Sequence, residues 1–356
     1  MRKHGLLYGA VAEALKRWLR LLRDHPCQAD HDLNDKTFAL VNRVLKAQAR
    51  YVIVRIETVV VKTVSELSRF LDRRQALVYP APAVLALFLI VIIPIGYNLY
   101  LAFNKWTIGL GQPRFIGFEN FLELLSDERV LNGVKVMVYF SGVSLTLELV
   151  LGLLIAVYFN REFKGSELVQ AIYIFPFAAT PVAVALIWRI MLNQEIGVMN
   201  YLLRSVGLPG IPWVSSEHTV IPALVLVDVW KWTPMITLIV LAGLKSLPHD
   251  PYEAARIDGA NALQIFWYIT LPLIRPVLIA ALMLRSLDNL KEFDMIYTIT
   301  QGGPGIASET LYLYSYNVGF SFFKAGYGSA LMVVVFLIVL AFNVVMNRMR
   351  LSAQSL

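Results

Sequence analysis

Residues 247–260 read LPHDPYEAARIDGA, and they decide the fold because this polar loop lies between two long apolar runs, about 219–244 and about 269–298. Each run has the roughly 20 residues that a helix needs to cross about 30 Å of hydrocarbon. Only 16% of the 356 residues are charged and 57% are hydrophobic, whereas soluble domains carry about 25% charged residues. The composition therefore places the chain among membrane proteins.

The local chemistry of this loop predicts a short helix. Asp250 is expected to cap its start, and Pro251 suits the first turn, where a missing N–H costs least. Glu253 lies near the positive end of the helix dipole, and Gly259 permits a sharp exit. The two alanines after Glu253 give the helix a slim face. Such a helix, held parallel to the membrane, can dock into a groove on a soluble partner.

Four further apolar runs flank this pair, so the sequence predicts six membrane-spanning helices. We expect an all-α, polytopic membrane protein whose transmembrane domain covers residues 78–350 and includes the polar loop 245–268. The six expected spans are about 78–103, 133–158, 168–192, 219–244, 269–298 and 327–346.

Residues 1–77 form a separate, basic extension that precedes the spans. It carries 15 Lys and Arg against 8 Asp and Glu, a surplus of 7 that equals the net charge of the whole chain. Helices are expected at about 6–23 and about 36–72, with Asn34 or Asp35 as the cap of the second and a linker containing Pro26 between them. Two interpretations remain open: the helices lie on anionic membrane lipid, or they pack on the rest of a complex.

Basic residues near the span ends predict the orientation. Both termini and the 245–268 loop are expected in the cytoplasm, and residues 104–132, 193–218 and 299–326 outside. The basic residues of the cytoplasmic side are Arg69, Arg73, Arg74, Arg161, Lys164, Arg348 and Arg350, and those of the outer side are Lys105, Arg114, Arg129, Arg204 and Lys324.

The loop carries the pattern E-A-A-x-x-D-G-A, followed by I-x-L-P-x-x-x-P, and this pattern resembles the EAA loop of ABC importer permeases. The resemblance implies that the loop is the coupling helix that docks on an ATPase subunit. The matching residues are Glu253, Ala254, Ala255, Asp258, Gly259, Ala260, Ile269, Leu271, Pro272 and Pro276.

Other motifs resemble the carbohydrate-uptake branch of that family, in particular the first, maltose-type permease of a heterodimeric pair. They include FDMIY at 293–297, GGP at 302–304 and FIGFENF at 115–121. The resemblance covers roughly residues 76–350 and implies the type I importer permease fold. It also implies a second homologous permease, a cytoplasmic ATPase dimer, an extracytoplasmic solute-binding protein and a sugar, polyol or related hydroxyl-rich solute. The first 75 residues depart from the short N-terminus that is usual in the family.

Charged residues inside the spans mark a candidate solute pathway, because charge in the bilayer is costly. The fourth span carries Asp228 and Lys231, and the fifth carries Arg285, Asp288 and Glu292, which are expected to share one helical face. The resemblance places substrate contacts near Lys231, Trp232, Met235, Arg285, Asp288, Asn289 and Glu292.

Structural pairing is the alternative interpretation of these charges. Arg285 with Asp288, and Asp228 with Lys231, have the spacing of intrahelical ion pairs, or they pair with the sister subunit. For Glu148 and Arg189, which are single charges in their spans, structural pairing is the expected role.

The sequence does not predict an enzyme. No Walker motif is present, so ATP and Mg are expected on the partner ATPase and no cofactor on this chain. One cysteine, Cys27, allows no internal disulfide or cysteine zinc cluster, and five scattered histidines give no metal site. No secretory signal peptide and no nucleic-acid partner are expected.

An ion-coupled secondary transporter without an ATPase is the alternative function. It predicts inverted repeats and broken helices, and no clear repeat relates the two halves of this chain. A membrane scaffold is a further alternative, but it predicts few charges within the spans.

Overall fold

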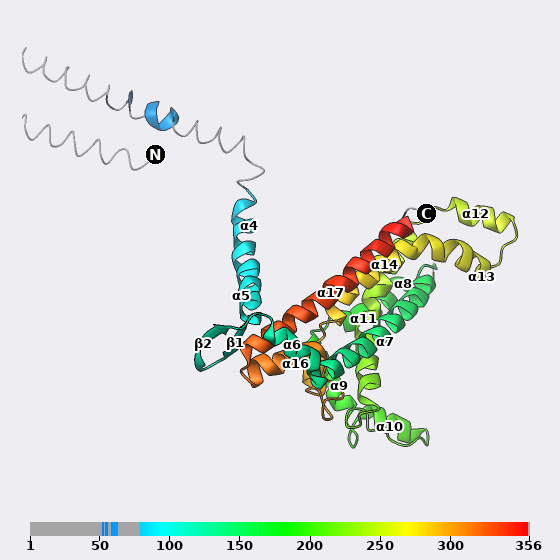
Figure 1. The fold of residues 1–356 in the computed structure, drawn as a ribbon. Coiled ribbons are helices and arrows are strands. Elements are labelled where there is room, and N and C mark those ends of the chain that lie inside the picture. Colours follow the sequence, from blue (N-terminus) through cyan, green and yellow to red (C-terminus); the bar gives the residue numbers. More distant parts are fainter. Residues whose placement is uncertain (1–51, 53, 56–57, 63–78, 162, 355–356) are drawn as a thin grey trace, which may run out of the picture. The chain divides into compact units, whose positions relative to one another are not determined.

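The computed structural model describes residues 52, 54–55, 58–62, 79–161 and 163–354 (Figure 1). Contacts between Cα atoms divide the chain into two units, Met1–Phe88 and Leu89–Leu356, and each is described by itself. In the first unit, residues 52, 54–55 and 58–62 are helical, and helix α4 covers Ala81–Leu87. The predicted helix at 6–23, the linker and most of the predicted helix at 36–72 lie outside the described residues.

Long apolar helices confirm four of the six predicted spans closely. The first comprises α4, the π-helical turn Phe88–Ile92 and α5 (Ile93–Ala102), and the others are α7 (Glu128–Phe159), α11 (Val220–Lys245) and α17 (Ala325–Gln354). With the fifth span, five described helices are long and apolar enough to cross a membrane, and a bent pair brings the number to six.

The third span is not the single helix that the sequence predicted. It consists of α8 (Ser166–Ala178) and α9 (Pro181–Met191), whose axes differ by 93°. Pro181 explains the break, because proline lacks the N–H that would continue the ladder and biases the residue before it toward extended backbone. Thr180 has that extended conformation, with φ −64° and ψ 139°.

The fifth span begins and ends earlier than predicted. It starts at Ala262, where Asn261 and Gln264 form a capping box, and runs through α13 (Ala262–Ile265), the π-helical Phe266–Thr270 and α14 (Leu271–Asn289). The chain then turns, and Asp294–Ile299 forms the separate helix α15. The polar residues after Leu284 therefore end the span instead of continuing it to residue 298.

Smaller elements connect the spans. Strands β1 (Asn104–Thr107) and β2 (Leu110–Phe115) form an antiparallel hairpin that the all-α prediction did not include. Gly109, with φ +86°, supplies the backbone conformation that its tight turn requires. The remaining elements are α6 (Glu119–Ser126), α10 (Val198–Ser205), α12 (Asp250–Ile257), α16 (Leu311–Tyr316) and the π-helical Asn317–Ser321.

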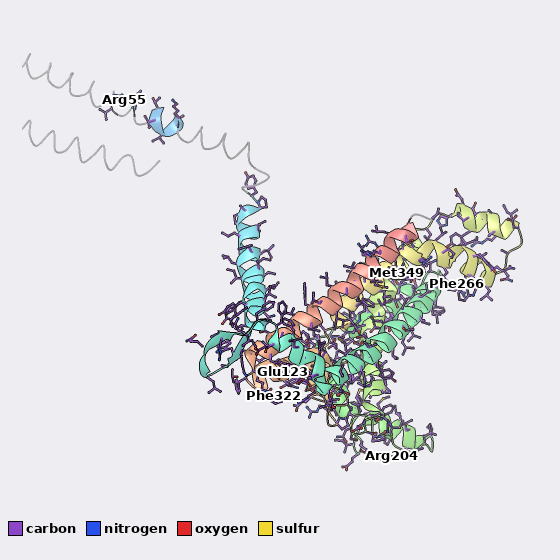
Figure 2. The ribbon with its side chains drawn as sticks, in the orientation of Figure 1. Arg55, Glu123, Arg204, Phe266, Phe322 and Met349 are labelled. Carbon is purple, nitrogen blue, oxygen red and sulfur yellow. The ribbon has the colours of Figure 1, made fainter. Side chains whose placement is uncertain are left out.

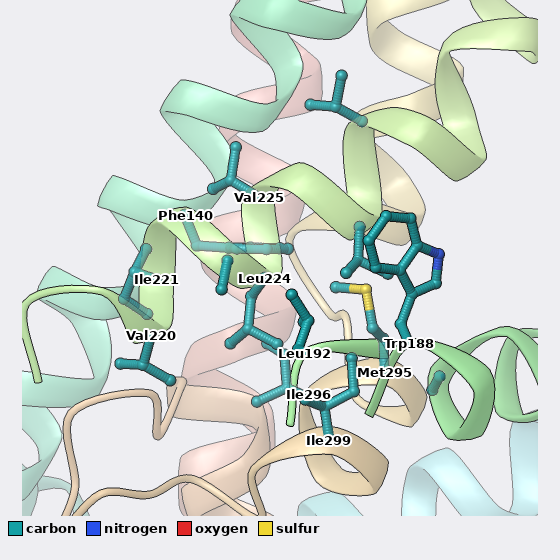
Figure 3. Close-up of a cluster of buried hydrophobic side chains, with 14 of the residues drawn as sticks. Phe140, Trp188, Leu192, Val220, Ile221, Leu224, Val225, Met295, Ile296 and Ile299 are labelled. Atoms are coloured by element: carbon teal, nitrogen blue, oxygen red, sulfur yellow. The ribbon is translucent and has the colours of Figure 1, made fainter. Parts of the chain in front are cut away.

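Helix α11 lies at the centre of the second unit, between α7, α8 and α14. Its membrane-crossing window is 67% buried, against 22% for the span that contains α14. Figure 3 shows Leu224 of α11 among Phe140 of α7, Trp188 of α9 and Ile296 of α15 in one hydrophobic cluster. The centre of the unit is therefore assembled from four elements that are far apart in the sequence.

Two glycines allow close approach along α11. A Cβ on Gly152 of α7 would lie 2.6 Å from Ile236, and a Cβ on Gly243 would lie 2.8 Å from both Ile274 and Val277 of α14. Such distances are shorter than van der Waals contact, so a side chain at either position would force Ile236, Ile274 or Val277 to move. Helices α7 and α14 are consequently packed tightly against α11 near the end that leads into the 245–268 loop.

Candidate functional site

A buried charge cluster joins the three central helices. The Arg285 side chain of α14 is fully buried, and its Nε donates to Oε2 of Glu148 on α7 at 2.9 Å. Its Nη2 donates to Oε1 of Glu148 at 3.1 Å and to Oδ1 of Asp228 on α11 at 2.7 Å. One guanidinium thus bonds two carboxylates, in a bidentate geometry with Glu148, as a low-dielectric site requires.

Asn289 extends this cluster by one helical turn. Its Nδ2 donates to Oδ2 of Asp228 at 2.8 Å, so Asp228 accepts from two residues of α14. Within the described residues, Nη1 of Arg285 and Oδ1 of Asn289 are the buried atoms of this cluster that have no hydrogen-bond partner. The cluster therefore holds a free donor and a free acceptor, which is the pair that a hydroxyl group or a water molecule satisfies.

Two cations contact the indole of Trp232. The Arg285 Cζ lies 4.4 Å from the ring centroid, and the Lys231 Nζ lies 4.8 Å from it. Phe177 of α8 meets the same ring edge-on at 5.5 Å between centroids. The Trp232 ring is half-buried and contacts both cations. It therefore helps to hold the Arg285 guanidinium, which the two carboxylates do not surround completely.

Among the described residues, the intrahelical ion pairs of the alternative interpretation do not form. Arg285 bonds Glu148 and Asp228 across helices, while Asp288 forms an exposed pair with Lys291 at 3.4 Å. The prediction that Arg285, Asp288 and Glu292 share one face is also wrong. At 100° per residue, Asp288 and Asn289 lie on opposite flanks of the direction of Arg285, and α14 is rotated so that Asn289 is buried and Asp288 is exposed.

The other predicted pathway residues divide by accessibility. Lys231 is buried, whereas Trp232 and Met235 on α11 are half-buried. Glu292 lies beyond the end of α14, and its Oε1 accepts a hydrogen bond from the backbone N–H of Met295 at 3.1 Å. It therefore supports the start of α15.

Glu148 was absent from the predicted pathway set, although it completes the central cluster. Its expected structural pairing is confirmed, with Arg285 as the partner. The available signal was a carboxylate in an apolar span, but one sequence does not tell which of several cations pairs with it. Arg189 donates from Nη1 to the backbone oxygen of Thr298 at 3.2 Å.

The loop after α11 contains the predicted helix. Helix α12 (Asp250–Ile257) has Pro251 in its first turn, and Gly259 after it has φ +79°. The predicted cap is wrong by one position: the N-cap residue is His249, and no side-chain hydrogen bond caps the helix. Asp250 instead is the first helical residue, where its charge still favours the dipole.

The residues matched to the EAA pattern are accessible. Because α12 lies at the edge of the unit, Glu253, Ala254, Asp258 and Gly259 are exposed, and Ala255 and Ala260 are half-buried. A hollow of about 330 Å³ beside the helix is lined by Asp258, Gly259, Ala260, Gln264, Ile265, Tyr268 and Ile269.

Exposed apolar groups lie next to this hollow. Ile257 is 86% exposed and Tyr268 is 80% exposed, which is costly unless another surface covers them. A single side-chain bond ties α12 to the fifth span within the described residues: the Tyr252 hydroxyl donates to Thr270 Oγ1 at 3.3 Å.

A second charged network, which the sequence did not predict, lies at the N-terminal end of α7. Arg129 donates from Nε and Nη2 to the two carboxylate oxygens of Glu309, at 2.6 and 2.9 Å. Asp127 caps α7 and accepts from the hydroxyls of Tyr314 and Tyr327, at 2.8 and 2.7 Å. Burial alone raises the pKa of Asp127, but the hydrogen bonds from the two tyrosines and the backbone bring it below its ordinary value.

No group of three or more His, Cys, Asp and Glu side chains that could hold a metal ion occurs in the described part of the chain.

Comparisons with known proteins identify the class. A family model described as "Binding-protein-dependent transport system inner membrane component" matches residues 148–351. The trehalose/maltose transport system permease protein MalF of Thermococcus litoralis is 37% identical over 264 residues, which is 74% of this chain and 89% of that protein. The sulfoquinovosyl glycerol transport system permease protein SmoG of Agrobacterium fabrum is 35% identical over 266 residues, covering 74% and 86%.

Solved structures show the same fold. A chain of the bacterial alginate ABC transporter, crystallised with its alginate pentasaccharide-bound periplasmic protein, superposes with a TM-score of 0.69 at 24% identity. The match covers 79% of this chain and 96% of that one.

The chain belongs to the family of binding-protein-dependent transport system inner membrane components. It is a permease of the ABC importer class, so the predicted family and fold are confirmed.

Proposed function

We propose that this permease imports a sugar, polyol or related hydroxyl-rich solute, driven by ATP that a separate ATPase dimer hydrolyses. One observation carries the proposal: α11 and the fifth span hold the buried polar cluster between them, and the loop that joins these two spans presents α12 as an exposed helix. A force applied to α12 therefore acts on α11, which carries Asp228, and on α14, which carries both unpaired polar atoms.

The chemistry of the cluster supports an uncharged, hydroxyl-rich solute. The negative charges of Glu148 and Asp228 outweigh the positive charge of Arg285, so its guanidinium offers a hydrogen-bond donor without an unbalanced positive charge. The acceptor on Asn289 completes a donor–acceptor pair of the kind that a sugar hydroxyl satisfies. The names of the two relatives, trehalose/maltose and sulfoquinovosyl glycerol permeases, also point to carbohydrates.

Within this proposal the solute pathway passes the exposed Asp288 and the half-buried Trp232, Met235 and Glu292, and the buried cluster beside them holds α11 and α14 in place. Solute entry to the buried atoms requires α11 and α14 to move relative to their surroundings, which is the motion that ATP binding would drive. The residues proposed for the pathway remain Lys231, Trp232, Met235, Arg285, Asp288, Asn289 and Glu292.

The proposed partners follow from the family. The ATPase dimer docks on the helix that contains Glu253 to Ala260, and a second homologous permease completes the pathway, because one set of six spans encloses only half of it. A solute-binding protein delivers the solute from outside, and both termini lie in the cytoplasm. ATP and Mg bind the ATPase subunits, and this chain carries no cofactor.

The rival proposal, an ion-coupled secondary transporter, gives α12 no role. The exposed Ile257 and Tyr268 beside α12 favour an importer whose loop is covered by another subunit.

The test is co-purification of the chain with its neighbouring gene products, followed by Glu253→Arg and Gly259→Asp. We expect both variants to release the ATPase, because the first reverses a charge on the docking face and the second forces a side chain into positive φ. Glu123→Arg is the matched control, since Glu123 is equally exposed but lies on α6 (Figure 2). Retention of a fully stimulated ATPase in both loop variants would refute the coupling role.

A further inference from the structure

One buried asparagine organises the segment between α9 and α11. The Asn200 side chain of α10 is fully buried, and its Nδ2 donates to the backbone oxygens of Gln194 and Ile211 at 3.0 and 2.9 Å. Its Oδ1 accepts from the Ile211 N–H and from Nε1 of Trp213, both at 2.9 Å. Four hydrogen bonds to one side chain fix the orientation of α10.

A helix oriented in this way is apolar on the outside. The inward side presents the amide of Asn200, whereas the outward side presents aliphatic side chains and one tyrosine. On α10 the exposed apolar residues are Val198 at 50%, Tyr201 at 72% and Leu202 at 53%, and the flanking residues Ile196 at 78%, Val206 at 72% and Leu208 at 53% extend this apolar surface. A soluble surface would show the opposite arrangement, so this face requires an apolar partner.

Charged groups are kept off that face. Arg204, the only cation of α10, donates from Nη2 to the backbone oxygen of Gln194 at 3.1 Å, and thus points back toward the pinned segment. Figure 2 shows Arg204 at the end of the unit where α10 lies. The one charged side chain of α10 is therefore exposed but held toward Gln194, and the apolar residues of the helix carry no charge among them.

The position of α10 relates this face to the bilayer. It follows α9, which ends the bent membrane pair, and it precedes α11, which begins a span at Val220. Figure 1 shows α10 at the end of the unit opposite to α12. Its 8 residues extend only about 12 Å, at roughly 1.5 Å each, too short to cross the hydrocarbon.

The apolar surface is also continuous with a neighbouring one. Val182, Leu186 and Ile190 of α9 are exposed at spacings of four residues, which is the pattern of a lipid-facing stripe. After a turn of a few residues the chain presents the exposed face of α10.

We propose that α10 lies in the lipid interface on the side of the membrane opposite to the coupling loop, with its apolar face among the acyl chains. The aliphatic residues enter the hydrocarbon boundary, and the hydroxyl of Tyr201 stays at headgroup level, where tyrosine is favoured. The Asn200 network holds the helix parallel to the membrane, so it anchors the start of α11, the helix at the centre of the unit.

The test measures contact with lipid directly. In a Cys27→Ser background, which removes the single native cysteine, Tyr201→Cys and Val206→Cys are labelled with the environment-sensitive fluorophore NBD. Glu217→Cys, an exposed polar position of the same segment, is the matched control. The full chain, with its partner subunits, is placed in nanodiscs of phosphatidylglycerol and phosphatidylethanolamine, with or without bromine on the upper acyl chain.

We expect brominated lipid to reduce the emission at positions 201 and 206 by about twofold, and aqueous iodide to have little effect there, since an interfacial helix buries its apolar face about 5–10 Å deep. The label at position 217 should respond to iodide and not to bromine. Quenching by iodide at 201 and 206, without quenching by bromolipid, would overturn the proposal. Shielding that arises only when the solute-binding protein is added would also overturn it, and would assign the face to that protein.

Discussion

Two arginine–carboxylate networks lie at different heights of the same helix α7, and they differ in completeness. The outer network of Arg129 and Glu309 leaves none of its buried side-chain atoms without a partner in the described structure, and Asn317 adds a further bond to Glu309 at 2.9 Å. The central network of Arg285, Glu148 and Asp228 leaves Nη1 of Arg285 and Oδ1 of Asn289 unpaired.

This difference distinguishes a network with a structural role from one that belongs to a functional site. Unpaired buried polar atoms destabilise a fold by about 1–3 kcal/mol each, so an incomplete network at the centre of the protein calls for a function, whereas a complete one at the end does not. The predictions below test whether the central network serves transport as well as stability, and whether the outer one serves stability alone.

The largest effect is expected from Glu148→Ala. The substitution removes two of the three carboxylate bonds of the fully buried Arg285, and breaking a buried pair in this way costs about 3–5 kcal/mol. Thermal unfolding of the purified chain in detergent measures the loss. Glu195→Ala, at an exposed position, is the control, and an equal unfolding temperature for both variants would contradict the assignment.

A smaller loss of stability is expected from Arg129→Ala. Glu309 is only 3% exposed and would lose its bidentate donor, at a cost of about 1.5–3 kcal/mol. Uptake by the folded variant should stay near the native level. Arg114→Ala, in the exposed strand β2, should change neither quantity. Loss of transport with unchanged stability would show that the outer network is more than structural.

Asn289→Ala is expected to act mainly on transport. It removes the unpaired acceptor and one bond to Asp228, and the loss of one such hydrogen bond, about 1–1.4 kcal/mol, lowers uptake by roughly fivefold to tenfold. Uptake into proteoliposomes, with the sugar that the partner receptor binds, measures this effect. Leu284→Ala, on the exposed side of the same helix, is the control.

The smallest effect is a pH dependence in the outer network. The pKa of Asp127 is lower in the folded protein than in the unfolded chain, where it is about 3.9. Above that unfolded pKa, the hydrogen-bonded carboxylate contributes its full stabilisation. The contribution is lost as the pH falls through the folded pKa. Tyr327→Phe should cost about 1 kcal/mol near neutral pH. The gap to the native protein should shrink below about pH 4.

Unfolding temperatures across this range provide the measurement. Tyr201→Phe, on the exposed face of α10, is the control. A gap that stays constant down to about pH 3 would show that the tyrosine acts independently of the Asp127 charge.

Much of this architecture was predictable from the sequence. Spans near 133–158, 219–244 and 327–346 were predicted because long apolar helices are defined by composition alone, and α12 followed from Pro251 and Gly259. The bend at Thr180 was not predicted, because bending depends on whether surrounding helices satisfy the backbone around Pro181.

The candidate site was predictable only as a set of residue types. Asp228, Arg285 and Asn289 were identified as unusual in a bilayer, but the rotation of α14 decides that Asn289 faces inward and Asp288 outward. The pairing of Glu148 with Arg285 joins residues 137 positions apart, and no local pattern reports such a contact.

The glycine at position 243 has a mechanical consequence. Because even a methyl group there would lie 2.8 Å from Ile274 and Val277, α11 and α14 are interlocked just before the chain leaves for α12. Interlocked helices at such a contact cannot slide past each other without first separating, since packed interiors yield little. In the proposed mechanism the pair would move as one rigid unit, so a displacement of α12 by the ATPase would be transmitted along both helices instead of being absorbed where they begin.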